Sequence, residues 1–187
     1  MNIKKFALAL MLLVPYAAAH ELQENRATLV LRDKTHISVT LYIAYSDALY
    51  QALMPQRPFA AFLLIYSAMK PEDLEKELRR AQSKFQSATR MYLSPGPGRE
   101  ITITNWVWPD VKQVQTMLQQ RIMAAMVDPK GHAHDSPIEI RADANAPHEI
   151  ASVTVKFPEE FRKVLVVSYR PNQLWVDSQS LSPEIKF

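Results

Sequence analysis

The 187-residue chain contains no cysteine, which excludes disulfide bridges, thiolate metal sites, thiol catalysis and a lipidated cysteine anchor. Its three glycines are too few for a glycine-rich phosphate loop, and none flanks a serine in a Gly-x-Ser-x-Gly turn. The metalloprotease pattern His-Glu-x-x-His is also missing. We therefore expect a protein that is not an enzyme.

No apolar run is long enough to remain in a bilayer, and the longest one begins the chain. The amino terminus has a basic start, a short apolar run, a helix breaker and small residues before a cleavage point, at Lys4-Lys5, residues 6–14, Pro15, Ala17 and Ala19. These features together are typical of a secretory signal rather than a membrane span. We expect residues 1–19 to be removed between Ala19 and His20, which leaves residues 20–187 in the periplasm or secreted.

The charge of the mature chain is close to balanced. Lys4 and Lys5 leave with the signal, which reduces the 22 basic residues to 20 against 19 acidic ones and the net charge from +3 to +1. No block of lysine and arginine is interleaved with aromatic residues. This pattern gives no support for a nucleic-acid partner.

Alternation of apolar and polar residues predicts most of the strands. Residues 25–43 alternate as a β-hairpin with its turn at Asp33-Lys34. Further strands are expected at 86–93, 99–108, 138–142, 150–157, 164–169 and 174–176. The run Val164-Leu165-Val166-Val167 is apolar without interruption, which indicates a central strand covered on both faces.

The middle of the chain is predicted to be helical. A short helix capped by Ser46-Asp47 should run to Leu53, followed by helices at 59–69, at 71–85 and from Pro109-Asp110 to about 128. The third helix has a narrow apolar stripe of Leu74, Leu78, Ala81 and Phe85. The fourth has a stripe of Val114, Leu118, Ile122, Ala125 and Met126.

These elements predict one α+β domain over residues 20–187. Seven or eight strands bracket a helical insertion in the middle of the chain, and no repeat or linker divides them. The simplest arrangement is an antiparallel sheet or β-sandwich with the helices packed on one face or at one end.

Four histidines are candidate metal ligands. His132-x-His134 in extended backbone places both imidazoles on one side, about 6 to 7 Å apart. Asp135 offers an oxygen ligand beside them. If His20 is the first residue, its amine and imidazole form a chelate for Cu(II) or Ni(II) that one further imidazole from His132, His134 or His148 would complete. Imidazole and amine ligands together favour Cu(II) or Zn(II). The alternative without a metal is that His132 and His134 lie in a solvated polar loop and that the terminus at His20 is mobile. His36 is expected to be an ordinary surface residue.

Aromatic residues offer a candidate partner surface. Trp106 and Trp108 fall on one face of a predicted strand, where they either pack between sheet and helix or form an exposed binding patch. Met117, Met123 and Met126 on the fourth helix are better explained by packing than by a thioether copper site.

Five short segments resemble the exported amino-terminal domains of the hydrogenase/urease accessory membrane-protein family. They are Ala-His-Glu-Leu-Gln at 19–23, Ala-Thr-Leu-Val-Leu at 27–31, Val-Thr-Val-Lys-Phe-Pro at 153–158, Val-Val-Ser-Tyr-Arg-Pro at 166–171 and Gln-Leu-Trp-Val at 173–176. The chain is more loosely similar to uncharacterised exported bacterial proteins of its size. The resemblance implies an extracytoplasmic β-rich module linked to metal handling. It transfers no catalytic residue, and the membrane helices of that family have no counterpart here.

The sequence thus predicts a non-enzymatic exported accessory protein that binds an envelope protein partner. The alternative is a copper-type metal-binding protein that uses His20 with His132 and His134 or with His148. Exposed Trp106 and Trp108 would support the first, and convergence of the histidines the second.

Overall fold

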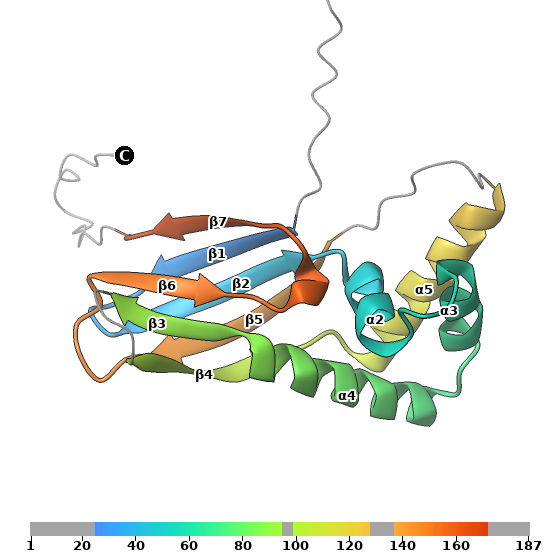
Figure 1. Cartoon of the computed structure of the whole chain (residues 1–187), viewed down its shortest axis with the longest axis horizontal. Helices are drawn as coiled ribbons and strands as arrows, with labels where there is room; N and C mark the ends of the chain where they lie inside the picture. The colour runs from blue at the N-terminus through green and yellow to red at the C-terminus, as the bar shows by residue number, and fades with distance from the viewer. Residues whose placement is uncertain (1–24, 95–98, 128–136, 172–187) are drawn as a thin grey trace, which may run out of the picture.

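The computed structural model describes residues 25–94, 99–127 and 137–171, and shows an α+β fold. Seven strands form one curled, mostly antiparallel sheet, a half-barrel, and four helices gather at one end of it (Figure 1). The elements are β1 (Asn25–Leu31), β2 (His36–Ile43), α2 (Tyr45–Leu53), α3 (Phe59–Ser67), α4 (Pro71–Ala88), β3 (Arg90–Ser94), β4 (Glu100–Val107), α5 (Val111–Val127), β5 (Ile138–Asn145), β6 (Ser152–Lys156), the short 3₁₀ helix η1 (Glu159–Phe161) and β7 (Val164–Tyr169). The predicted fold class and the mid-chain helical insertion are confirmed.

The predicted hairpin at the start of the domain is present. Strands β1 and β2 pair antiparallel, with Leu29 opposite Val39. Asp33 shapes the turn because its Oδ1 accepts hydrogen bonds from the backbone N–H groups of Thr35 (2.7 Å) and His36 (2.9 Å). These bonds hold the pKa of the exposed Asp33 carboxyl below its usual value.

The strand order is β6-β3-β4-β5-β2-β1-β7, so β6 and β7 form the two edges of the sheet. The chain returns after η1 to pair β7 parallel to β1, with Val166 opposite Ala27. Among the described strands β7 pairs with β1 alone, so within this part of the chain the strand at 164–167 is an edge strand and not the predicted central one. An unbroken apolar run indicates a strand that would be stable with both faces buried. It does not indicate the position of that strand in the sheet, which depends on the rest of the chain.

Helix α4 confirms the predicted stripe, since Leu74, Leu78, Ala81 and Phe85 are all buried. The helix runs to Ala88, however, and the strand predicted from Gln86 begins only at Arg90. Thr89 ends the helix by donating both its N–H (3.0 Å) and its hydroxyl (2.8 Å) to the Phe85 carbonyl.

Helices α2 and α5 depart from their predicted details. Helix α2 begins at Tyr45 after an Ala44 cap without a side-chain bond, so the predicted Ser46-Asp47 cap is wrong. In α5 only the first half of the predicted stripe is buried; Met126 is 69% exposed and Ala125 is also exposed. The far end of α5 extends past α3, and no described element lies against it there (Figure 1).

The core lies inside the curl of the sheet and against the helical end. Inward side chains alternate along β2 and β5, for example Val39 and Ile140, and the opposite face is polar. At the helical end, Tyr45, Phe85, Trp108 and Phe161 form an aromatic cluster with ring centroids 5.0 to 6.4 Å apart. Among the described residues, no helix is long and apolar enough to cross a membrane.

Candidate functional site

The two edge strands of the half-barrel line one pocket of about 570 Å³. Its walls are mainly apolar and come from the hairpin, from β6 and from β7: Leu29, Leu31, Ile37, Val153, Val155 and Val166. Ser152, Ser168 and Arg170 add polar groups. No ladder joins β6 to β7 within the described residues. The sheet therefore stops short of closing, and the pocket lies at the gap; we call it the edge pocket.

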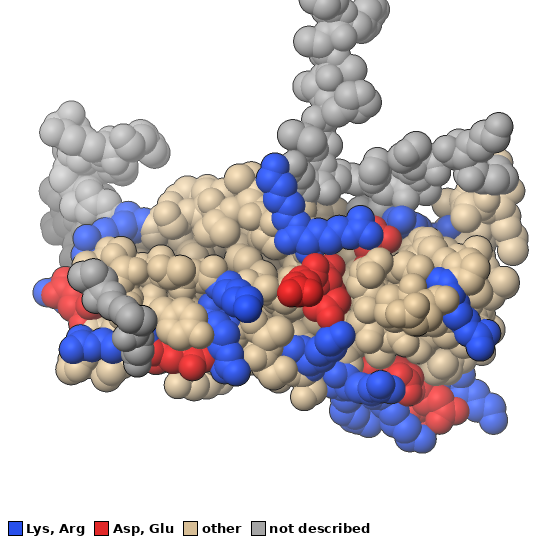
Figure 2. All heavy atoms as spheres, in the orientation of Figure 1, with Lys and Arg blue, Asp and Glu red and all other residues tan. Residues whose placement is uncertain are grey.

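Strand β7 exposes apolar side chains on both of its faces. Val166, which points inward like its neighbour Ala27, is 46% exposed, and Leu165 and Tyr169 on the outer face are 52% and 57% exposed. In Figure 2 the surface over β6 and β7 is largely uncharged, whereas acidic and basic groups crowd along α4. An apolar edge strand without charged residues is a site at which another strand can pair.

The link between β6 and β7 is held firmly at the other end of the gap. The Asn25 side chain donates from Nδ2 to the Phe161 carbonyl (2.6 Å) and accepts the Ala44 N–H at Oδ1 (2.7 Å). Lys84 pairs with Glu160 at 2.6 Å. Burial raises the pKa of the Glu160 carboxyl, but the hydrogen bond from Lys84, a hydrogen bond from the backbone N–H of Glu160 itself and the charge of Lys84 together hold that pKa below its usual value. These contacts hold β6 and β7 at a fixed separation near η1. At the pocket, no described hydrogen-bond ladder joins the two strands.

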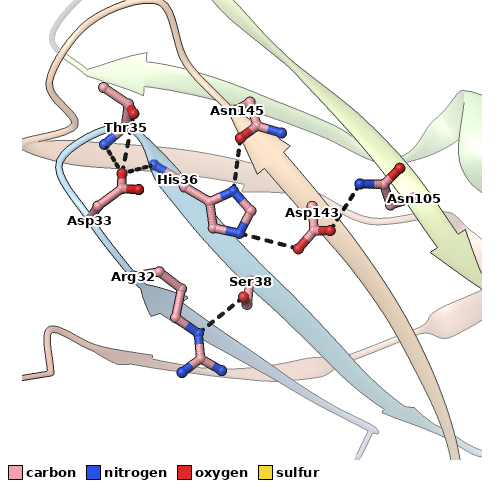
Figure 3. Close-up of polar contacts among 8 residues, drawn as sticks. All are labelled: Arg32, Asp33, Thr35, His36, Ser38, Asn105, Asp143 and Asn145. Carbon is pink, nitrogen blue, oxygen red and sulfur yellow. Dashed lines mark hydrogen bonds and ion pairs between the residues drawn. The ribbon is translucent and has the colours of Figure 1, made fainter.

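A network of polar side chains around His36 lies on the outer face of the sheet (Figure 3). The His36 ring is 2.8 Å from Asn145 Oδ1 at Nδ1 and 3.3 Å from Asp143 Oδ1 at Nε2. Asn105 donates from Nδ2 to the second oxygen of Asp143 at 3.1 Å. The row of contacts joins β2, β5 and β4, so it fixes the register of three strands.

A bulge in β4 makes the last of these contacts. The β4–β5 register shifts between Thr104 and Val107, and Asn105 has a left-handed backbone with φ of 52°. Asparagine tolerates this conformation better than most residues. Both His36 nitrogens already face oxygen atoms, so this histidine serves the sheet rather than standing free as a ligand.

The candidate metal ligands divide into two groups by position. His20, His132, His134 and Asp135 lie outside the described residues, and His148 is exposed in the connection from β5 to β6. Across the sheet, Arg26, Tyr42 and Glu139 form one row, so the segments leading into β1 and into β5 start from the same end of the sheet. The two strands are separated only by β2, about 10 Å in all.

His148 follows the opposite end of β5, about 23 Å along the strand from Ile138. Among the described residues, no group of three or more histidine, aspartate or glutamate side chains could hold a metal ion. The fold thus brings the attachment points of His20 and of His132-x-His134 together and leaves His148 apart.

The tryptophan pair lies between β4 and the helices. Trp106 and Trp108 stack at 5.4 Å with an interplanar angle of 14°, and both are half-buried against the core. Trp108 is also 6.3 Å from Tyr45. Their role in partner binding stays a prediction, while the larger exposed apolar surface is on β7.

The edge pocket was not predicted from the sequence. The sequence feature that could have indicated it is the apolar run of β7, which the sequence alone led us to interpret as a central strand covered on both faces. Comparison with known proteins finds no match among protein-family models, curated proteins or solved structures.

Proposed function

We propose that this protein is a non-enzymatic exported binding protein that takes up an extended apolar segment of an envelope protein as an added strand beside β7. The observation that carries this proposal is the exposure of β7, a strand with the composition of a sheet interior, at the edge of an unclosed half-barrel. A strand added there gains main-chain hydrogen bonds from the free edge, and its alternate side chains enter the edge pocket.

The residues that line the edge pocket determine which side chains of the partner segment bind well. Apolar side chains of β1, β6 and β7 favour valine, leucine or aromatic residues at alternate positions of the partner. Ser152 and Ser168 are small lining residues and leave room for a bulky side chain. The outward positions of the partner lie beside Leu165 and Tyr169 and tolerate either polar or apolar residues.

Val166→Lys should weaken strand binding at least tenfold, because it places a charge in the pocket wall without touching the buried core. The probe is a fluorescein-labelled peptide of alternating valine and threonine with a central tryptophan and lysine at each end, titrated with the mature chain and followed by anisotropy. Leu64→Lys is the matched control, since Leu64 is 55% exposed on α3, and its affinity should equal the wild type's.

Equal affinity in Val166→Lys and wild type, or no saturable binding, would contradict the proposal. Dodecanoate is added as a competitor. If the fatty acid displaces the peptide at micromolar concentration while unlabelled peptide does not, the pocket belongs to an acyl chain and the strand proposal fails.

We propose Cu(II) binding by His20 with His132 and His134 as the second candidate function. It is supported by the position of the strands that these residues precede, since β1 and β5 both begin at the same end of the sheet with only β2 between them. A terminal amine and imidazoles are nitrogen ligands of the kind Cu(II) prefers. The position of His148 beyond the far end of β5 removes it from this proposed set.

Mature protein beginning at His20 should bind one Cu(II) in a calorimetric titration. One glycine added ahead of His20, or His134→Ala, should weaken binding at least tenfold, because each removes a nitrogen ligand. His148→Ala should leave the affinity unchanged. Equal affinities in the extended and native chains would reject a terminal site.

A further inference from the structure

We propose that a second pocket, between α4 and β6, binds a small phosphate monoester between the side chains of Arg90 and Lys156. The pocket has a volume of about 500 Å³, within the usual range for small-molecule sites. Its walls come from the last turn of α4, the start of β3 and the connection from β6 into η1, and we call it the α4–β6 pocket. Figure 2 shows basic and acidic groups together where the end of α4 lies beside η1.

The α4–β6 pocket is separate from the edge pocket. Successive side chains of a strand point to opposite faces of the sheet. Val155 therefore lines the edge pocket, whereas Lys156, the next residue of β6, lines the α4–β6 pocket. The inference concerns a different site from the strand-binding proposal and does not depend on it.

Two cationic residues are directly opposite each other in this pocket. In the antiparallel pairing of β3 with β6, Arg90 is the partner of Lys156, and both line the pocket. Opposite residues of an antiparallel pair share a face, with Cβ atoms about 5 Å apart, and like charges at such positions destabilise the sheet. An anion bound between the two side chains replaces this repulsion by attraction. The pairing therefore favours a ligand with more than one negative charge.

Both cations have donors to offer such a ligand. Arg90 uses Nη1 to bond Glu100 Oε1 at 2.8 Å, and Glu100 lies on β4, on the far side of β3 from Lys156. A guanidinium has five N–H donors, so this bond leaves others for a ligand. Lys156 is exposed, and no residue in the described ranges forms a hydrogen bond or an ion pair with its ammonium group.

The rest of the lining supplies a hydroxyl and apolar surface. Tyr92 is two residues from Arg90 along β3, so it shares that face, and its hydroxyl has no partner in the described part of the chain. The half-buried Phe157 offers apolar contact to the body of a ligand. Lys84 also lines the pocket, but it is bonded to Glu160 at 2.6 Å, and this pair fixes the wall between α4 and η1.

A phosphate monoester matches these donors better than a carboxylate does. Near neutral pH it carries a charge of about −1.5 to −2 and has three terminal oxygens. It can therefore accept hydrogen bonds from Arg90, Lys156 and Tyr92 together, whereas a carboxylate has a single charge and two oxygens. Glu159 is an exposed carboxylate in the same lining, and its charge opposes the ligand and limits the affinity.

Lys156→Gln should weaken the binding of phenyl phosphate by about tenfold or more, because a hydrogen bond from a charged group contributes that much to affinity. Calorimetric titration of the full mature chain in a buffer free of phosphate measures it. Glu159→Gln should strengthen binding severalfold, since it removes the opposing charge. Lys112→Gln, on the exposed face of α5, is the matched control for the loss of one positive charge and should bind like wild type.

Stability separates a binding role of Lys156 from a structural one. Lys156→Gln should unfold at the same urea concentration as wild type or at a higher one, because it removes the repulsion between opposite cations. A lower midpoint together with unchanged affinity for phenyl phosphate would show that Lys156 serves the sheet alone.

Three other outcomes would overturn the proposal. The first is the absence of saturable binding, or equal affinity for phenyl phosphate in wild type, Lys156→Gln and Glu159→Gln. The second is benzoate binding as tightly as phenyl phosphate, which would make the ligand a carboxylate. The third uses vesicles of phosphatidylcholine that contain phosphatidate, a lipid with the same phosphate monoester: if the vesicles bind the protein and phenyl phosphate does not, the ligand is a membrane lipid. The peptide titration of Val166→Lys remains a separate test of the edge pocket.

Discussion

Replacement of Phe161 by alanine is expected to lower the free energy of unfolding by about 3 to 5 kcal/mol, the range for deleting a fully buried aromatic ring. Phe161 has no exposed surface and packs 5.0 Å from Phe85 in the aromatic cluster at the helical end of the half-barrel. Such a loss is a large part of the 5 to 15 kcal/mol that stabilises a typical domain. Urea denaturation followed by circular dichroism measures it.

The position of Phe161 ties this stability to the site. It is the last residue of η1, and η1 joins the two edge strands that line the pocket. Tyr169→Ala is the control, because it removes an aromatic ring that is 57% exposed on β7 and should change stability by less than about 0.5 kcal/mol. A loss below about 1 kcal/mol for Phe161→Ala would show that the cluster does not anchor η1.

Much of the fold follows from local patterns. Period-2 alternation over 25–43 predicts the hairpin because each of its strands buries only one face, and β2 does so at every second residue. The stripe of α4 predicts its burial for the same reason, since Leu74, Leu78 and Phe85 recur at helical spacing and have a single surface to cover.

The errors arise where burial depends on elements distant in sequence. The stripe of α5 looks uniform, yet Leu118 is buried and Met126 is not, because α5 has 17 residues and its main contact, α3, has only 9. The predicted end of α4 is too early because the apolar stripe stops at Phe85, whereas the helix continues to Ala88 and ends where Thr89 bonds the Phe85 carbonyl.

Strand β7 shows how such an error can itself indicate function. The run Val164 to Val167 has the composition of a strand with two neighbours, and the described strands supply one, β1. A local preference that the topology leaves unsatisfied is expected at functional sites. The His36 network is a different case: sequence alone gives no sign that Asp143 and Asn145, more than a hundred residues away, face the same ring.

Asn25→Ala is expected to lower the free energy of unfolding by about 2 to 4 kcal/mol, because it leaves two backbone groups without their partner and each costs about 1 to 3 kcal/mol when water cannot replace it. The Asn25 side chain bonds the Ala44 N–H at 2.7 Å and the Phe161 carbonyl at 2.6 Å, and both bonds are partly buried. One amide thereby joins the start of β1 to the β2–α2 junction and to η1.

The matched control is Asn145→Ala, which removes an exposed amide bonded to His36 and should cost no more than about 1 kcal/mol. In hydrogen exchange, the Ala44 amide should lose its protection in Asn25→Ala and keep it in Asn145→Ala. A similar small loss in both variants would mean that water replaces the Asn25 side chain, and that Lys84–Glu160 and the Phe161 ring suffice to hold η1. Because Phe161 and Asn25 act on the same short helix, their double variant should lose less than the sum of the single losses.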